Sequence, residues 1–196
     1  MLLIEHRVNT VEKLLSVPAE RGVEVDVREL GGELRLAHDP YECGQRLEDL
    51  LRAYHHALII FNVKCDGLEE RILALAAEHE IEQFFFLDLA PATLIRLAQA
   101  GLRQAAVRFS EFEPVEAALE LAGRVEWVWV DCFSRRPLDR ADYQRLRPHF
   151  KLCLVSPELQ GLPRAELAGW RRALAGMPID AVCSDLCDEW AAGGVG

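Results

Sequence analysis

The chain has 196 residues, 51% of them hydrophobic, so it can bury a sizeable core and is not intrinsically disordered. Its formal net charge of −10 disfavours nucleic acid and anionic membranes as main partners, because both need a basic protein face. It shows no apolar run of the ~18 residues that a membrane span needs, no secretory segment and no disulfide or zinc spacing of cysteines, so the sequence predicts a cytoplasmic protein.

Eight short apolar segments have the composition and length of β-strands. In chain order they are residues 2–6, 23–28, 57–63, 84–89, 105–109, 126–131, 151–156 and 180–184. A hairpin-like turn with Gly31 and Gly32 follows the second segment. Helix patterns with start or stop signals separate the others, as in residues 66–80, 90–101 and 113–123.

This alternation predicts the α/β class, with parallel strands joined by helices. Eight strand–helix units predict a compact (β/α)8 TIM barrel, formed as a single domain over residues 1–196. The alternative is an open doubly wound sheet. The glycine-rich phosphate loops that would favour that alternative are missing after the early strands.

Two carboxylates lie on the second predicted strand. Glu24 and Asp26 are two residues apart, so both side chains leave the same face of the strand. If that face is the barrel interior, the pair needs a cation, because buried uncompensated charges are costly. Mg²⁺ or Ca²⁺ takes oxygen ligands and fits such a pair. The alternatives are a solvated strand face and an ion pair with Arg28 or Lys64.

Further polar residues gather at the C-terminal ends of the predicted strands, where barrel enzymes place their catalytic groups. His6 follows the first strand and His38 follows the hairpin, so the two can act as general acid and base across one reacting centre. Arg7 and Lys64, after the first and third strands, can hold a phosphate. A metal, two histidines and two cations together suggest phosphodiester cleavage.

Two residues of the second half of the chain are weaker candidates for substrate contacts. Trp129 lies near the end of the sixth strand and is a candidate for stacking on a base or sugar, with a core position as the alternative. Arg108 is a candidate for a further anion contact, with an ion pair to Glu111 or Glu113 at a helix cap as the alternative.

The order of these motifs resembles the glycerophosphodiester phosphodiesterase family, within the wider phospholipase-C-like phosphodiesterase barrels. That family typically shows His-Arg-Gly after strand 1, an Asn-Thr helix start, Glu-x-Asp on strand 2, a His-Asp pair and Glu-x-Lys on strand 3. This sequence has HRVNTVEKL (6–14), GVEVDV (22–27), LAHDP (36–40) and FNVK (61–64). The motifs cover residues 4–64, and beyond them the resemblance rests on the strand–helix rhythm.

The resemblance implies a role for each matching residue. His6 and His38 would be the acid–base pair, Arg7 and Lys64 would bind phosphate, and Glu24 and Asp26 would bind the divalent ion. It also implies that a neighbouring hydroxyl of the substrate alcohol attacks phosphorus, while the ion neutralises the non-bridging oxygens.

The sequence departs from the family pattern at three places. Asn62 stands where the family has a third metal-binding glutamate, so the ion would bind more weakly through the amide oxygen, with Asp88 or Asp131 as compensating carboxylates. Val8 replaces the glycine after His-Arg. The usual insertion after His38-Asp39 is missing, so the chain is expected to enter a helix almost at once and to leave an open mouth.

The sequence therefore predicts a metal-dependent phosphodiester hydrolase, with a small-molecule or carrier-linked substrate that can be a glycerophosphodiester or a nucleotide- or polysaccharide-linked one. The alternative is a catalytically degenerate phosphate-ester-binding domain, which Asn62 and the short loops favour and the two histidines disfavour. A sugar-phosphate isomerase or aldolase with Lys64 as the Schiff-base lysine is a weaker reading, because the neighbouring carboxylates suit a metal better.

Overall fold

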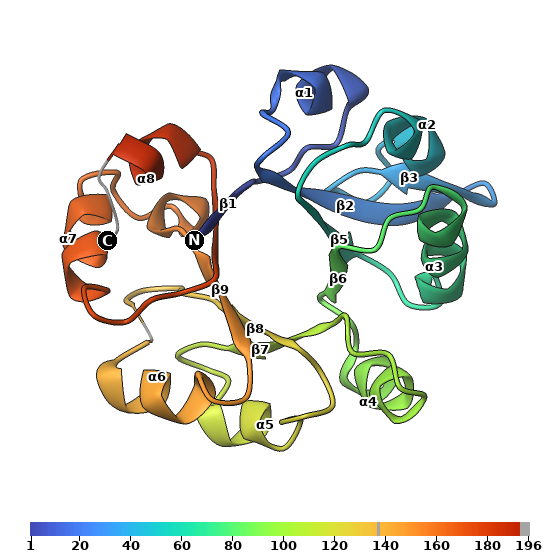
Figure 1. The fold of residues 1–196 in the computed structure, drawn as a ribbon. Helices are drawn as coiled ribbons and strands as arrows, with labels where there is room; N and C mark the ends of the chain where they lie inside the picture. The colour runs from blue at the N-terminus through green and yellow to red at the C-terminus, as the bar shows by residue number, and fades with distance from the viewer. Residues whose placement is uncertain (137, 193–196) are drawn as a thin grey trace. The chain divides into compact units, whose positions relative to one another are not determined.

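The structure is a computed structural model that describes residues 1–136 and 138–192. Contacts within the chain group it into two compact units, one formed by Glu5–Arg96 and the other by Met1–Ile4 together with Leu97–Gly196. In both units strands alternate with helices, except that three strands follow one another within residues 22–46, as the ribbon in Figure 1 shows. None of the helices in the described ranges has the length and apolarity that crossing a membrane requires.

The unit formed by Glu5–Arg96 is built on a sheet in the order β4-β3-β2-β5-β6. Its strands are β2 (Gly22–Leu30), β3 (Glu33–Leu36), β4 (Gln45–Arg46), β5 (Leu58–Val63) and β6 (Phe84–Leu87). Its helices are α1 (Val11–Ser16), α2 (Leu47–Arg52), α3 (Glu69–Glu78) and α4 (Pro91–Gln99), the last of which continues into the other unit.

Strand β2 takes part in two kinds of pairing. It runs parallel to β5, with Asp26 opposite Asn62, and β5 in turn runs parallel to β6, with Asn62 opposite Leu87. The far end of β2 turns back into the antiparallel strand β3 through Gly31 and Gly32, whose φ angles of 62° and 84° suit a tight hairpin turn and glycine. Asp26, Asn62 and Leu87 therefore lie in one row across three parallel strands, near their C-terminal ends.

Both faces of β2 are buried. Its valines, Val23, Val25 and Val27, are 0% exposed, as an alternating apolar set predicts. Glu24 and Asp26 belong to the opposite set, and each is only 1% exposed. The strand is thus not an amphipathic strand with its charged face in water, and its two carboxylates must find their partners inside the protein.

The second unit carries the remaining strands in the order β1-β10-β9-β8-β7, and β7 to β10 pair in parallel. The strands are β1 (Leu2–Glu5), β7 (Ala106–Phe109), β8 (Trp127–Val130), β9 (Lys151–Val155) and β10 (Ala181–Ser184). The helices are α5 (Val115–Leu119), α6 (Arg140–Leu146), the 3₁₀ helix η1 (Pro157–Gln160), α7 (Glu166–Ala173) and α8 (Cys187–Ala192).

Each of the eight predicted strands is present, as β1, β2 and β5 to β10, and so is the hairpin at Gly31 and Gly32. The expectation that a helix follows His38 and Asp39 almost at once is wrong, because α2 begins only at Leu47, after β4. Gly44 supplies the reason. A Cβ atom there would lie 1.8 Å from the carbonyl oxygen of Leu36, so glycine allows the chain to approach β3 closely, and Gln45 and Arg46 then pair with β3.

Candidate active site

The buried carboxylate of Glu24 is held by two hydrogen-bond donors. The backbone N–H of Arg7 donates to its Oε2 atom at 2.7 Å, and the side-chain amide of Asn62 donates to its Oε1 atom at 2.8 Å. Burial raises the pKa of Glu24, and the negative charge of Asp26 raises it further, while His6 and the two hydrogen bonds act in the opposite direction. Two neutral donors therefore contact this carboxylate, and His6 adds a favourable charge interaction.

The loop after β1 is shaped to make the first of these contacts. Arg7 has a φ of 51°, which is unusual for a residue other than glycine and turns its N–H toward β2. The ammonium of Lys13 donates to the backbone oxygen of His6 at 2.6 Å, which fixes the loop from the side of α1. The side chain of Arg7 is exposed and that of His6 is partly exposed, so both can meet a substrate.

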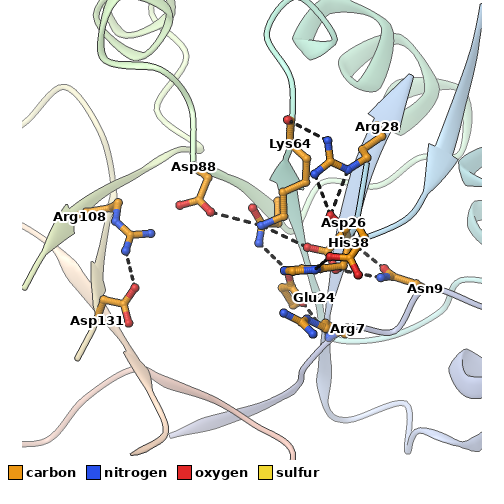
Figure 2. A network of polar contacts seen from close by, with 12 residues as sticks. Arg7, Asn9, Glu24, Asp26, Arg28, His38, Lys64, Asp88, Arg108 and Asp131 are labelled. Carbon is orange, nitrogen blue, oxygen red and sulfur yellow. Dashed lines mark hydrogen bonds and ion pairs between the residues drawn. The ribbon is translucent and has the colours of Figure 1, made fainter. Parts of the chain in front are cut away.

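Asp26 has different partners. Asn9 donates from its amide nitrogen to Oδ2 of Asp26 at 2.8 Å and accepts from the backbone N–H of Asp26 at 2.9 Å. The ammonium of Lys64 lies 3.3 Å from the other carboxylate oxygen, Oδ1, and 3.4 Å from Oδ2 of Asp88. Figure 2 shows Lys64 between these two aspartates. Of the readings that the sequence left open, the Lys64 ion pair is therefore present and the solvated strand face is not.

Sequence reasoning did not assign a role to Asn9, although it supplies two of the contacts of Asp26. The available signal was its place in the Asn-Thr segment of the motif at residues 6–14. Asp88 was considered only as a compensating metal ligand, and in the structure it pairs with Lys64. Its φ of 59° is again a left-handed conformation of a non-glycine residue beside the site.

Two buried oxygen atoms of the site have no hydrogen-bond partner among the described residues, Oδ1 of Asp26 and Oδ1 of Asn62. An ionised carboxylate only accepts hydrogen bonds, so the NH₂ group of Asn62 faces Glu24 and its carbonyl oxygen is left over. The two residues are opposite each other in the β2–β5 register. Oxygen atoms left without donors are suitable ligands for Mg²⁺ or Ca²⁺, so the donor set of Glu24, Asp26 and Asn62 fits a hard divalent ion.

Within the described ranges, no group of three or more histidine, cysteine, aspartate or glutamate side chains is arranged to hold a metal ion. The set at β2 and β5 has two carboxylates and one neutral amide, which places less negative charge on an ion than three carboxylates would. The expected consequence is weak binding, because the affinity of oxygen sites for such ions follows the charge of their ligands.

His38 follows β3 and forms a pair with the next residue. Its Nδ1 atom lies 2.7 Å from Oδ1 of Asp39, which favours a proton on Nδ1 and leaves the lone pair of a neutral ring on Nε2. Arg28 donates two hydrogen bonds to the backbone oxygen of His38, at 3.1 and 2.7 Å. These contacts hold the histidine at the same end of the sheet as Asp26, whose backbone oxygen accepts from Ala37.

Arg108 and Trp129 belong to the unit that contains Leu97–Gly196. Arg108 donates to Glu113 at 3.0 Å and also pairs with Asp131, so the helix-cap ion pair given as the alternative is present. Asp131 also accepts from Gln160 at 2.9 Å. Trp129 is 6% exposed, which corresponds to the core position. A substrate contact of either residue stays a prediction.

Three solved structures have the same fold as this chain. The first, with a TM-score of 0.74 and 14% sequence identity over 98% of this chain and 96% of the other, is a protein from Agrobacterium tumefaciens strain C58 assigned as a glycerophosphoryl diester phosphodiesterase. The second is a glycerophosphodiester phosphodiesterase from the same strain, with a TM-score of 0.64 and 15% identity over 97% of this chain and 99% of the other.

The third structure is a glycerophosphoryl diester phosphodiesterase from Parabacteroides distasonis, with a TM-score of 0.65 and 15% identity over 97% of this chain and 85% of the other. No protein-family model matches the chain, and no curated protein matches its sequence. The fold class predicted from the sequence is thus confirmed: the chain has the α/β TIM-barrel fold of the glycerophosphodiester phosphodiesterase structures.

Proposed function

We propose that the chain is a phosphoric diester hydrolase that uses the polar cluster at the C-terminal ends of β2 and β5. The observation that carries this proposal is the buried Glu24–Asp26 pair, with two adjacent oxygen atoms, Oδ1 of Asp26 and of Asn62, that lack hydrogen-bond partners. A buried carboxylate pair of this kind is costly to keep without a function. The names of the three solved structures of the same fold support phosphodiester hydrolysis as that function.

Glu24, Asp26 and Asn62 would hold a divalent ion, Mg²⁺ or Ca²⁺. When bound there, the ion supplies charge neutralisation of the non-bridging phosphate oxygens. The side chains of Arg7 and Lys64 supply further positive charge for the phosphate group. The buried walls of β2 and β5 exclude water from this side of the site, which strengthens each of these electrostatic contacts.

His6 and His38 are the proposed proton-transfer pair. One imidazole removes the proton from the substrate hydroxyl that attacks phosphorus, and the other protonates the alcohol oxygen as its bond to phosphorus breaks. A cyclic phosphate results, and water opens it with the roles of the two groups reversed. The Asp39 carboxylate orients the ring of His38 through Nδ1, so that Nε2 is the atom that exchanges the proton.

The substrate is a small-molecule or carrier-linked phosphodiester. The net charge of −10 supports this choice over nucleic acid, because a nucleic-acid enzyme needs a basic face for the phosphate backbone. Glycerophosphodiesters and nucleotide- or polysaccharide-linked diesters are the first compounds to assay. The six cysteines are free thiols, which supports action in a reducing compartment such as the cytoplasm.

The histidine pair gives a test of this function. In a panel of phosphodiesters with saturating Mg²⁺ or Ca²⁺, His6→Ala and His38→Ala should each lower turnover by about 10²–10⁴-fold, the usual contribution of general acid–base catalysis. Binding of the substrate should change much less. Turnover that survives the loss of both imidazoles would reject their proposed roles.

A second candidate function is a phosphate-ester-binding domain without turnover. The observation that favours it is that Asn62 donates to Glu24 and Lys64 pairs with Asp26, so internal groups already compensate both carboxylates. In that case no member of the panel is hydrolysed by the wild type with any ion, and the histidine variants change only the affinity for phosphate esters.

A further inference from the structure

The ammonium of Lys64 lies next to Oδ1 of Asp26, the one carboxylate oxygen of the site that has no hydrogen-bond partner among the described residues. The ammonium is 3.3 Å from Oδ1 of Asp26, and the Lys64 side chain is only 17% exposed. The backbone of Lys64 is anchored on both sides, because its N–H donates to Val27 and its carbonyl oxygen accepts from Arg28. Any movement of the ammonium is therefore a change of side-chain rotamer and not of the strand.

Oδ1 of Asp26 is also the atom with which Asp26 would bind a divalent ion, because Asn9 already occupies Oδ2. The ammonium and the ion are both cations and approach the same oxygen. Together with Glu24 and the neutral Asn62, the site offers two negative charges to an ion that carries two positive ones. A Lys64 ammonium that stays at Oδ1 of Asp26 then repels the ion at close range.

Asp88 is a second ion-pair partner for the Lys64 ammonium. Its Oδ2 atom lies 3.4 Å from the Lys64 nitrogen, on the side opposite Asp26 in Figure 2. Asp88 directly follows β6, one residue after Leu87, which lies opposite Asn62, and its φ angle is 59°. The side chain of Asp88 is 30% exposed, against 1% for Asp26, so a lysine that moves toward Asp88 moves toward the more exposed of its two partners.

We propose that Lys64 is a built-in counter-ion that competes with the divalent ion for Oδ1 of Asp26, and that ion binding moves its ammonium toward Asp88 and makes it available to the phosphate. The proposal rests on the proposed function, because it uses the ion site described there. It assigns to Lys64 an ordering role: the lysine becomes a phosphate ligand only after the ion has bound.

The chain has three lysines, Lys13, Lys64 and Lys151, which makes a direct measurement possible on the unmodified protein. In protein labelled with ¹³C-lysine, we expect addition of Mg²⁺ or Ca²⁺ to shift the Cε signal of Lys64 until the shift saturates. The dissociation constant from this titration should equal the one that calorimetry gives for the ion. The Cε signals of Lys13 and Lys151 should not shift. The ammonium of Lys13 bonds to backbone oxygens and that of Lys151 pairs with Glu126, so neither takes part in the ion site.

The matching substitution is Lys64→Met, or Lys64→Gln if the first variant does not fold. Without the competing ammonium, Mg²⁺ and Ca²⁺ should bind at least about tenfold more tightly. A tenfold change in the dissociation constant corresponds to about 1.4 kcal/mol of binding free energy. Lys151→Met removes the same charge from another lysine–carboxylate pair, in the other unit, and should leave ion affinity unchanged.

Two results would overturn the proposal and can be told apart. If the wild type binds the ion while the Lys64 signal does not move and the Lys64 variants bind no more tightly, then the competition is absent and the ion site stands. If neither the wild type nor the variants bind either ion, the ion site of the proposed function is absent and the competition falls with it.

Discussion

At the scale of single residues, the buried carboxylates of β2 are compensated by three different kinds of group. Glu24 receives a backbone N–H and a side-chain amide, and Asp26 receives an asparagine and a lysine. Neutral donors do not cancel a charge, so burial still raises the pKa of Glu24. Glu24 is therefore not part of a fully matched ion pair, and the proposed divalent ion would supply further positive charge.

A second group of buried polar atoms lies at the opposite ends of these strands, before β5 and β6. His56 is 7% exposed, and its Nε2 atom donates to the backbone oxygen of Val17 at 3.0 Å. Its Nδ1 atom has no hydrogen-bond partner among the described residues, and neither has the hydroxyl of Tyr54 or Nε2 of His79. All three residues line a pocket of about 340 Å³. Burial lowers the pKa of His56 below its ordinary value of 6.5.

This pKa predicts a pH dependence of stability. Below about pH 6.5 the unfolded chain protonates His56 more readily than the folded protein does, so the free energy of unfolding falls as the pH decreases toward the folded pKa. His56→Gln should reduce this loss, as measured by urea unfolding at about pH 7.5 and about pH 5.5. His55→Gln, at the exposed neighbour, is the control. An equal loss in wild type and His56→Gln would contradict the assignment.

At the scale of elements, the alternation of apolar strands and helices was predictable from the sequence. Strands and helices each give a characteristic spacing of hydrophobic residues along the chain. Segments such as residues 57–63 and 84–89 are apolar on both faces, which indicates strands of a parallel sheet. Strand β4 was not predictable in this way. It has only two residues, Gln45 and Arg46, and it exists because it pairs with β3, a contact that local composition does not record.

Gly44 is the residue on which that contact depends. Gly44→Ala would place a methyl group on the carbonyl oxygen of Leu36, and overpacking of this kind typically costs about 1–3 kcal/mol. We expect a loss of stability in that range in urea unfolding, together with a disturbed His38 loop.

Gly169→Ala is the control, because Gly169 lies in helix α7 and its added Cβ would meet nothing closer than 4.0 Å. There the substitution should stabilise the protein by about 0.5–1 kcal/mol, the usual gain in a helix interior. If the two variants behave alike, the close approach of Gly44 to β3 is not what shapes this segment.

At the scale of the whole molecule, the fold was predictable from the sequence. The contacts among the side chains of the candidate site were predictable only in part. The motifs at residues 6–14, 22–27, 36–40 and 61–64 made the carboxylates, the histidines and Lys64 candidates for the site, because a motif gives the order of residues along the chain. It does not give distances. The contacts of Asn9 with Asp26 and of Lys64 with Asp88 join residues 17 and 24 positions apart, and only the folded sheet brings them together.

The central claim is that the carboxylates of β2 serve an ion-dependent cleavage of phosphodiesters. The most direct measurement is single-turnover release of the phosphomonoester from the panel of diesters, with and without saturating Mg²⁺ or Ca²⁺, for the wild type and Asp26→Asn. The wild type should turn over only with the ion, and Asp26→Asn, with an unchanged fold, should lose ion binding and turnover together. Equal turnover of the two proteins, or no turnover of any diester by the wild type, would contradict the claim.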